Sequence, residues 1–454
     1  MSARPAFATL VPPPDRSGMP ERIGKYRVLA RLGEGATSEV FLAEDEFHQR
    51  QVAIKRVREA SAGNSIENHY RDRFFDAEAA LAGKLKHPNV VQIFDSVAHL
   101  AQPYLVMEYV PGVTLRRFCR PDALLSLDQV VEIGFKCAMA LGYMARQGLI
   151  HRDVKPANIL ATLGDGLVTD IKISDFGSVF DQLSDRTQVF RVGSLAYMSP
   201  EQLDGSTLDA RADMYALGAV LYHLVAGRPP FAATNQVALM HQIYHARPPL
   251  LAELREAVPP RMAELLHRAL AKRPEDRPDD WDSFAREWSL LAANGEVPAG
   301  RQQDVMDSER FTLLRSLEFF DGFGEVELWE VVHRGQWLRH DYGQALFRKG
   351  ESGDRFHIIA LGGVDVYRDG QRVAQLGAGT SVGEMAYLAP NAELRQHSAD
   401  VLVSVPATTL SFTPASLASL SSSTRQLFDA SFIRVLVRRL HAAHETLAHP
   451  RRIL

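Results

Sequence analysis

The stretch HRDVKPANIL, residues 151–160, is the most informative segment in the first half of this chain. It is followed by ISDFGS, residues 173–178, and the two segments contribute Asp153, Lys155, Asn158 and Asp175. One carboxylate can orient a hydroxyl nucleophile, while the other carboxylate and the asparagine can hold Mg²⁺ against phosphates. A lysine two residues after the first carboxylate can steady a moving phosphoryl group. The order and spacing of these side chains predict phosphoryl transfer.

Two segments nearer the N-terminus supply parts that this chemistry needs. In GEGATSEVFLAE, residues 33–44, Gly33 and Gly35 lie between two expected strands, where backbone N–H groups can approach phosphate oxygens. Ser38 stands where a third glycine is expected. In VAIK, residues 52–55, Lys55 lies on a strand of buried character, and a buried lysine is costly unless it is paired. We expect Glu78, on the following helix, to be its partner.

With these motifs in place, residues 24–292 resemble the catalytic domain of a eukaryotic-type serine/threonine protein kinase of the bacterial style. The resemblance implies a bilobal α+β fold that binds ATP with Mg²⁺, or with Mn²⁺ as an alternative, and that acts on protein substrates. It implies that Asp153 is the catalytic base and that Lys155 steadies the γ-phosphate. The metal would be held by Asn158 and Asp175. The implied ATP-binding residues are Gly33, Gly35, Val40, Ala53, Lys55, Glu78, Met107, Glu108, Val110 and Leu160.

The resemblance also gives individual roles around the adenine. Met107 would be the gatekeeper, residues 108–110 the hinge, and Leu160 the floor of the pocket. The stretch LATLGDGLVTDIKIS, residues 160–174, is longer than the family pattern. We interpret the extra residues as a longer hairpin tip that leaves catalysis intact.

Further along, the kinase resemblance implies two supporting contacts and a specificity. Glu201 should pair with Arg277, and Asp213 should anchor the catalytic loop from a buried helix. Lys155 and Ser194 favour serine/threonine over tyrosine specificity. Because every catalytic position is filled, a catalytically weak pseudokinase scaffold, whose β-roll docks partners, is the alternative and not the first interpretation.

Control of the kinase is expected in the segment after residue 177. Arg152 carries a positive charge next to Asp153 and calls for an anion from that segment. Our hypothesis is that autophosphorylation at Ser184 or Thr187 supplies it. The alternative is a loop whose polar residues serve only solubility.

The composition limits the classes of protein to which the chain can belong. It has 454 residues, 46% of them hydrophobic, a formal net charge of −4 and two cysteines, Cys119 and Cys137. This balance implies no general attraction to nucleic acid or membranes, and two isolated thiols fit the cytoplasm. Residues 1–23, with three consecutive prolines, are expected to be a disordered leader, and 293–309 a linker. No run approaches the roughly 20 apolar residues of a membrane span.

The pattern changes from about residue 310 to 454. Segments there alternate with period two, and Asp369-Gly370 predicts a hairpin turn. A helix over SLEFFDGFGEVELWEVV, residues 316–332, leads into these strands. In the C-terminal helix we expect an apolar stripe opposite the arginines 434, 438 and 439, made of Phe428, Phe432, Val435, Leu436 and Leu440. The segment resembles a cyclic-nucleotide-binding-like domain, which implies a β-roll or jelly roll with flanking helices.

One stretch of this second domain departs from the family pattern. In GEMAYLAPNAELRQHSADV, residues 383–401, Gly383 and Glu384 match the pair that holds a cyclic phosphate and a ribose hydroxyl. The position where the family has a phosphate-binding arginine holds His397. A neutral imidazole cannot make the bidentate, permanently charged contact of an arginine.

Three interpretations follow from that histidine. Arg395 reaches the phosphate instead, or His397 binds it when protonated, or the domain binds no cyclic nucleotide and serves another ligand, dimerisation or a protein partner. We favour the third and leave cyclic nucleotide binding open. The expected partners are protein substrates, a small-molecule effector and a second copy of the chain docked through the C-terminal helix. Nucleic acid is not expected, because no helix-turn-helix module follows that helix.

Overall fold

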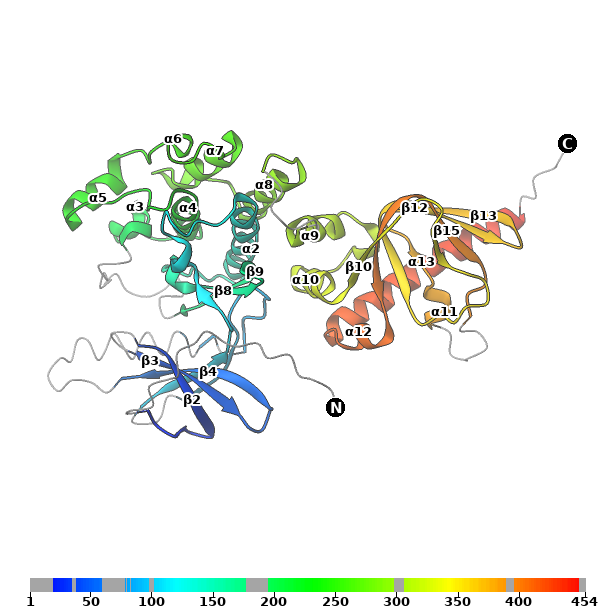
Figure 1. Cartoon of the computed structure of the whole chain (residues 1–454), viewed down its shortest axis with the longest axis horizontal. Coiled ribbons are helices and arrows are strands. Elements are labelled where there is room, and N and C mark those ends of the chain that lie inside the picture. The colour runs from blue at the N-terminus through cyan, green and yellow to red at the C-terminus, as the bar shows by residue number, and fades with distance from the viewer. Residues whose placement is uncertain are drawn as a thin grey trace. The chain divides into compact units, whose positions relative to one another are not determined.

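The computed structural model describes residues 19–34, 38–58, 78, 80–81, 83–97, 102–176, 195–297, 306–388 and 396–448. The chain divides into two compact units, residues 1–303 and 304–454. Figure 1 shows helices and strands in both units. None of the helices that are described is long and apolar enough to cross a membrane. Both cysteines are buried free thiols.

The first unit begins with an antiparallel sheet whose strands run in the order β1-β2-β3-β4-β6-β5. Its inner face is apolar, with Phe41, Val52, Ile54 and Val106 fully buried. Along β3 buried positions alternate with partly buried ones, as the period-two pattern of the sequence predicts, whereas Val52, Ala53 and Ile54 of β4 are all buried. The strands are β1 (Arg22–Ile23), β2 (Tyr26–Glu34), β3 (Ser38–Asp45), β4 (Arg50–Val57), β5 (Ile93–Val97) and β6 (Tyr104–Glu108).

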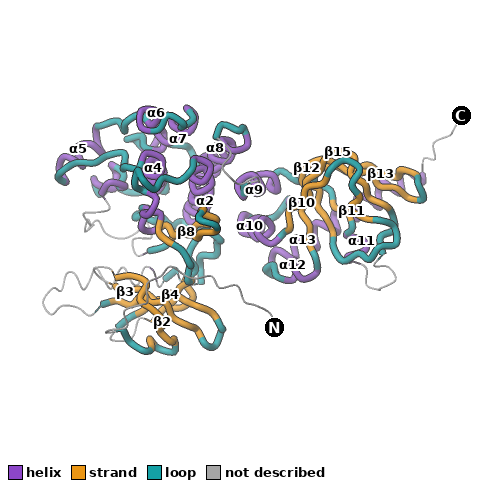
Figure 2. Tube along the Cα trace, viewed as in Figure 1, coloured by secondary structure: helices purple, strands orange, loops and turns teal. Residues whose placement is uncertain are grey.

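A mainly helical part follows, with a small sheet of order β7-β8-β9 beside it (Figure 2). The strands β8 and β9 form a hairpin with Asp165 and Gly166 at its tip, as the long stretch of sequence predicts. The strands are β7 (Val113–Thr114), β8 (Ile159–Gly164) and β9 (Leu167–Ile173). The α-helices are α2 (Leu127–Arg146), α3 (Pro200–Leu203), α4 (Arg211–Ala226), α5 (Gln236–His245), α6 (Leu251–Leu254), α7 (Pro260–Ala269) and α8 (Trp281–Ala293). The 3₁₀ turns are η1 (Leu115–Phe118), η2 (Pro156–Asn158), η4 (Leu195–Tyr197) and η5 (Pro274–Asp276).

Glycines allow α2 to lie close to α8. A Cβ atom on Gly134 would be 2.8 Å from the ring of Trp288, and one on Gly142 would be 2.8 Å from the Cβ atom of Trp281. Trp288 is fully buried. The two glycines are therefore tolerated inside a helix because each accommodates a tryptophan of the partner helix.

The second unit is a β-roll with helices at both ends. Its sheet has the order β10-β15-β12-β13, with β11 pairing with β15 and β14 with β12. The turn at Asp369 and Gly370 joins β12 to β13, as the sequence predicts. The strands are β10 (Gln336–His340), β11 (Ala345–Phe347), β12 (Phe356–Arg368), β13 (Gln371–Gly377), β14 (Ser381–Val382) and β15 (Asp400–Phe412). The helices are α9 (Asp307–Arg315), η6 (Glu318–Phe320), α10 (Glu325–Arg334), α11 (Glu384–Leu388), α12 (Pro414–Ala418) and α13 (Ser422–Ala448).

Two details of this unit differ from the sequence prediction. The helix predicted over residues 316–332 is interrupted, because Gly322 has a φ of +91°, and only the separate elements η6 and α10 form. On α13, Phe428 and Phe432 are buried against Phe356 of β12, as an apolar stripe predicts. Leu440 is 57% exposed, however, so the stripe turns away from the β-roll at that point.

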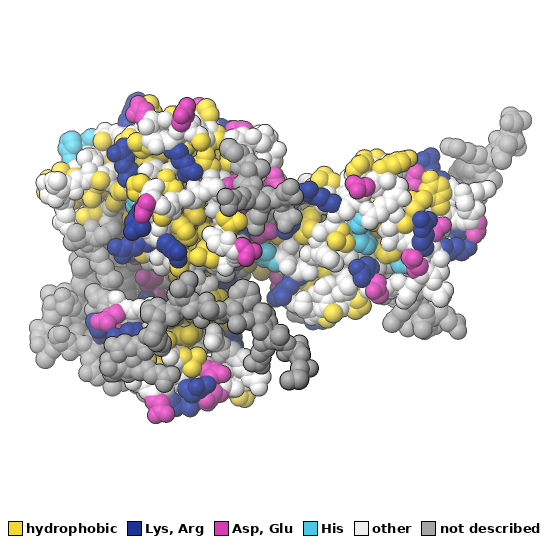
Figure 3. All heavy atoms as spheres, viewed as in Figure 1, with side chains coloured by type: hydrophobic (Ala, Val, Ile, Leu, Met, Phe, Trp, Pro, Cys, Tyr) yellow, Lys and Arg dark blue, Asp and Glu magenta, His cyan; other side chains and the backbone are white. Residues whose placement is uncertain are grey.

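The surface carries charges of both signs. On the face shown in Figure 3, Lys and Arg side chains lie among Asp and Glu side chains at several places. Many of these charges are paired, as Arg27 is with Glu44 and Arg268 with Glu287. The pairing agrees with the small net charge of −4.

Candidate active site and regulatory pocket

Strand register brings several candidate ATP-binding residues into line. Gly33 on β2 lies opposite Val40 on β3, and Val40 lies opposite Lys55 on β4. Ala53, two residues before Lys55, lies opposite Met107 on β6. The antiparallel pairing thus places on neighbouring strands residues that are distant in sequence. Gly35 lies outside the described residues.

Lys55 joins two carboxylates. Its Nζ atom donates to both carboxylate oxygens of Glu78, at 2.8 and 2.9 Å, and to Oδ1 of Asp175 at 2.7 Å. Burial lowers the pKa of Lys55, but the negative charges of Asp175 and Glu78 outweigh it and raise the pKa above its usual value. The charge of Lys55 holds the pKa of Asp175 below its usual range. Lys55 is therefore a fixed positive charge between two segments of the site.

Asp153 is held by two neighbours within its own loop. Lys155 donates from Nζ to Oδ2 of Asp153 at 2.6 Å. Asn158 donates from Nδ2 to the same oxygen at 3.0 Å and to the Asp153 backbone carbonyl at 2.9 Å. The carboxylate is 18% exposed, so it is oriented while solvent can still reach it. The structure brings these three candidates together, as their spacing predicts.

The loop that carries Asp153 is anchored from helix α4. Asp213 accepts a hydrogen bond from the backbone N–H of His151 at 2.6 Å and from that of Arg152 at 2.8 Å. Asp213 is 4% exposed, and burial raises its pKa. Arg152 has a φ of +65°, a conformation that costs free energy unless its surroundings hold it. The two hydrogen bonds to Asp213 stabilise this backbone conformation.

Oxygen ligands for a divalent cation are present beside this loop. The amide nitrogen of Asn158 donates to Asp153, so its amide oxygen can act as a ligand of the cation. Ser174, next to Asp175, donates from its backbone N–H to the Asn158 carbonyl at 2.8 Å. An amide oxygen and a carboxylate on adjoining loops form a donor set that fits a hard divalent cation.

The expected hinge and pocket floor lie on β6 and β8. Glu108 places its carboxylate 3.1 Å from Nζ of Lys172, a partner that sequence reasoning missed. Leu160 on β8 lies opposite Lys172 on β9. A Cβ atom on Gly112 would be 2.0 Å from the carbonyl oxygen of Ala161, so only glycine permits this approach of the hinge to β8. Val110 is half-buried in the same segment.

The expected pair between Glu201 and Arg277 is present. Arg277 donates to both carboxylate oxygens of Glu201, at 2.6 and 2.8 Å, and its side chain is fully buried. It also donates to the backbone carbonyl of Arg211 at 2.8 Å. Ser184, Thr187 and Ser194 lie outside the described residues.

Comparison with known proteins agrees with this geometry. A family model described as a protein kinase domain matches residues 26–289. The chain belongs to the protein kinase family. This family implies ATP and a divalent metal as cofactors.

Relatives of this chain occur in several bacteria. A probable serine/threonine-protein kinase of Corynebacterium efficiens is 38% identical over 61% of this chain and 43% of its own. A probable serine/threonine-protein kinase of Streptomyces coelicolor is 33% identical over 65% of this chain and 46% of its own length. The serine/threonine-protein kinase PknB of Mycobacterium leprae is 33% identical over 65% of this chain and 47% of its own length. The chain therefore spans less than half of the length of these relatives.

A second family model, described as a cyclic nucleotide-binding domain, matches residues 338–424 of the chain. Within it, Gly383 has a φ of +84°, and a Cβ atom there would be 2.7 Å from the ring of Phe347. Glu384 is 1% exposed and pairs with Arg439 of α13, a partner that sequence reasoning missed. The expectation that Arg439 lies opposite the apolar stripe of this helix is wrong, because its side chain reaches the buried Glu384 from the face of α13 that carries Phe432.

His397 lies deep in this domain. Its ring stacks on Phe347 with centroids 3.9 Å apart, and the residue is 7% exposed. Burial lowers the pKa of His397, although the negative charges of Glu351 and Asp354 act to raise it. A stacked, neutral imidazole gives no support to the hypothesis that a protonated His397 binds phosphate. Arg395 lies outside the described residues.

Proposed function

We propose that this chain is an ATP-dependent serine/threonine protein kinase that transfers the γ-phosphoryl group to protein Ser and Thr hydroxyls. The observation that carries the proposal is the Lys55 link between Glu78 and Asp175. Kinase activity requires this lysine–glutamate pair together with the metal-binding aspartate. The names of the bacterial relatives support the same activity. Free thiols at Cys119 and Cys137 support the cytoplasmic location that we propose with it.

In the reaction that we propose, Asp153 orients the substrate hydroxyl and accepts its proton as the new P–O bond forms and ADP leaves. Lys155 and Asn158 keep the Asp153 carboxylate aimed, since both already donate to it. Lys55 offsets negative charge on the phosphates. Bound Mg²⁺, or Mn²⁺ as the alternative, would neutralise further phosphate charge and would be held by Asn158 and Asp175.

The nucleotide would lie between the first sheet and β8. We assign the cover over the phosphates to the strands that carry Gly33 and Val40, with Gly35 in the same loop. The adenine pocket that we propose is formed by Ala53, Met107, Glu108, Val110 and Leu160. The pseudokinase alternative has no support in the described contacts, because the lysine pair and the held Asp153 are both present.

A transfer assay with a matched control tests the proposed activity. The full chain, the Asp153→Asn variant and the Asp165→Asn control would be given γ-labelled ATP, casein and either Mg²⁺ or Mn²⁺. Asp165 lies exposed at the tip of the β8–β9 hairpin with a φ of +50°, which asparagine also adopts. We expect wild type and the control to label casein, and Asp153→Asn to lose about two to four orders of magnitude.

The products of that assay decide between the alternatives. Phosphoserine and phosphothreonine are expected, and phosphotyrosine would contradict the specificity. No transfer by the wild type with either metal would favour the scaffold alternative. Full activity of Asp153→Asn would refute the role of Asp153.

We also propose that phosphorylation at Ser184 or Thr187 controls the kinase. Support comes from Arg152, which lies beside Asp153. Burial lowers the pKa of Arg152, and the negative charge of Asp213 opposes this shift only in part. An anion near Arg152 would relieve that cost. Phosphopeptide mapping and a Ser184→Ala/Thr187→Ala double variant test the idea. Unchanged activity of the double variant would count against it.

For the second domain we propose a small-molecule effector that binds at Gly383 and Glu384. The family match and the buried Glu384 carboxylate support a ligand, in preference to a β-roll used only for docking. Calorimetry of the full chain with cAMP and cGMP tests this, at pH 6 and pH 8. Absence of heat with both would favour another ligand or a partner protein.

We propose, finally, a homodimer through α13. Ile433, Val437 and Leu440 are 62%, 47% and 57% exposed and follow the spacing of three and four residues that forms a helix–helix seam. A second copy presents the same seam, so the surface is complementary to itself. Sedimentation of the full chain and of a Val437→Glu variant tests the proposal, and a monomeric wild type would refute it.

A further inference from the structure

Two histidines lie one turn apart on the exposed side of helix α5 (Gln236–His245). His241 and His245 are separated by the four-residue spacing that places both side chains on the same face of a helix. Both are exposed, and the centroids of their rings lie 4.8 Å apart. Figure 3 shows histidine side chains together on the surface over α5. The pair is separate from the residues that we assign to the kinase reaction.

The distance between the two rings fits a shared metal ion. Zinc binds a histidine nitrogen at about 2.0–2.1 Å, so two imidazoles at a tetrahedral angle on one ion have their ring centroids about 5 Å apart. The 4.8 Å between the rings of His241 and His245 is close to this value. Two histidines four residues apart on one helix face are also the zinc-binding pair of the metalloprotease motif.

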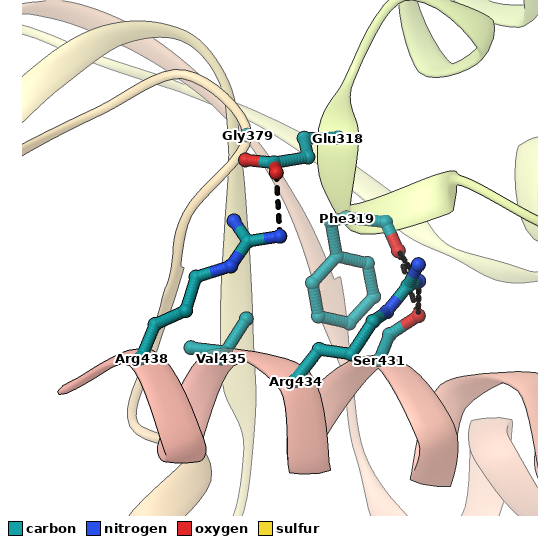
Figure 4. A pocket seen from close by; sticks show the side chains of 7 residues that line it. All are labelled: Glu318, Phe319, Gly379, Ser431, Arg434, Val435 and Arg438. Atoms are coloured by element: carbon teal, nitrogen blue, oxygen red, sulfur yellow. Dashed lines mark hydrogen bonds and ion pairs between the residues drawn. The ribbon is translucent and has the colours of Figure 1, made fainter. Parts of the chain in front are cut away.

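The ring nitrogens of the pair are not used elsewhere in the described part of the chain. Neither ring makes a hydrogen bond or an ion pair with a described residue. The pocket in Figure 4 is different, because its charged side chains already bind within the protein: Arg438 pairs with Glu318, and Arg434 donates to the Phe319 carbonyl. The nitrogens on α5 can therefore bind a metal, and imidazole suits Zn²⁺, Cu²⁺ and Ni²⁺.

The helix that carries the pair is fixed at both ends. Asn235 caps its first turn by accepting a backbone N–H at 2.8 Å. In the last turn, Nζ of Lys272 donates to the Ile243 carbonyl at 2.6 Å, and the hydroxyl of Tyr244 donates to Asp204 at 2.7 Å. The Ile243 side chain is fully buried. Both ligands thus lie on a rigid element, which favours a preformed metal site.

The charges near the pair favour a cation on balance. His245 is the last residue of α5, where the end of the helix carries partial negative charge. The Asp204 carboxylate beside Tyr244 adds another negative charge. The charge of Lys272 opposes a cation, but burial lowers the pKa of Lys272 to about 8, helped by the charge of Arg277. Part of that opposing charge is therefore lost in mildly alkaline solution.

We propose that His241 and His245 form a site for a transition-metal cation of the Zn²⁺ or Cu²⁺ class. Within the described part of the chain no group of three or more His, Cys, Asp or Glu side chains could hold a metal ion, so this site has two protein ligands. Water completes the coordination, as in zinc sites that keep an open position. The site is distinct from the Mg²⁺ position that we propose at Asn158 and Asp175, where the donors are oxygens.

Calorimetry of the full chain with Zn²⁺ tests the site, in a buffer with excess Mg²⁺ to occupy oxygen donors. The proteins are wild type, His241→Gln, His245→Gln and the control His441→Gln, an exposed position on α13. We expect each α5 variant to bind Zn²⁺ at least about tenfold more weakly, since loss of even a supporting partner costs a metal site about 10- to 100-fold. His441→Gln should match wild type. Equal binding by wild type and His241→Gln would overturn the proposal.

Two double variants test the spacing while keeping the number of histidines unchanged. In the His245→Gln background, Val237→His restores a pair four residues apart, whereas Gln236→His places the new ring five residues from His241, on another face. Val237 is 78% exposed and Gln236 is exposed, so neither change disturbs packing. We expect Val237→His to recover most of the affinity and Gln236→His to bind as weakly as His245→Gln alone. Equal binding by the two double variants would refute the site.

Discussion

Acid should weaken the second domain through a pair of buried histidines. The hydroxyl of Thr409 lies 2.9 Å from Nε2 of His340 and 3.0 Å from Nδ1 of His357. One hydroxyl can donate to one ring and accept from the other, an arrangement that suits neutral imidazoles. His357 is 4% exposed, and burial lowers its pKa to about 3, helped by the charges of His340, Arg355 and His397 and opposed by Asp354.

The sign of the effect follows from that lowered pKa. In the unfolded chain a histidine titrates near about 6.5, so below this pH the unfolded state takes up a proton that the folded state refuses. The contribution of a neutral His357 is therefore complete above about pH 6.5 and is lost progressively as the pH falls toward 3. Between pH 7 and pH 4.5 the loss is about 2 to 3 kcal/mol, a large part of the ~5–15 kcal/mol that stabilises a domain.

The perturbation is His357→Gln, which keeps a polar group for Thr409 but cannot be protonated. The assay is hydrogen exchange of β12 in the full chain at pH 7 and pH 4.5, corrected for the intrinsic rate at each pH. We expect the opening free energy of wild type to fall by about 2 to 3 kcal/mol more than that of His357→Gln. His441→Gln, an exposed position on α13, should behave as wild type. Equal falls in wild type and His357→Gln would refute the reasoning.

Three further predictions concern stability. Arg277→Met leaves Glu201 without its buried partner and should cost about 3 to 5 kcal/mol, measured by urea unfolding of the first unit. Gly134→Val drives a side chain into Trp288, and we expect a loss of about 1 to 3 kcal/mol together with a change in tryptophan fluorescence. Phe428→Ala empties a fully buried site in contact with Phe412 and should cost about 3 to 5 kcal/mol in the second unit. A stability within about 0.5 kcal/mol of wild type in any of these would contradict the contact concerned.

Much of the candidate active site could be predicted because its residues lie in short, ordered motifs. Asp153, Lys155 and Asn158 belong to one loop, and their mutual hydrogen bonds follow from that spacing. The pair between Lys55 and Glu78 was predicted from the cost of burying an unpaired lysine. The contact between Glu108 and Lys172 could not be predicted, since it depends on how β9 lies against the hinge.

The helix predicted over residues 316–332 shows a different limit. Its apolar pattern is genuine on both sides, but a single glycine with a φ of +91° separates η6 from α10. Residue patterns report which side chains are apolar, and they do not report where the backbone turns. The position of such a break depends on the packing of the elements on either side.

Local spacing and periodicity were enough to predict the kinase family, the loop that carries Asp153 and the β-roll character of the second half. The surroundings of Glu384 and His397, in contrast, follow from tertiary packing. There His397 is stacked on Phe347, and Arg439, 55 residues after Glu384, provides the charge that a buried carboxylate needs. Contacts between distant segments follow from how helix and sheet pack, and no local pattern records them.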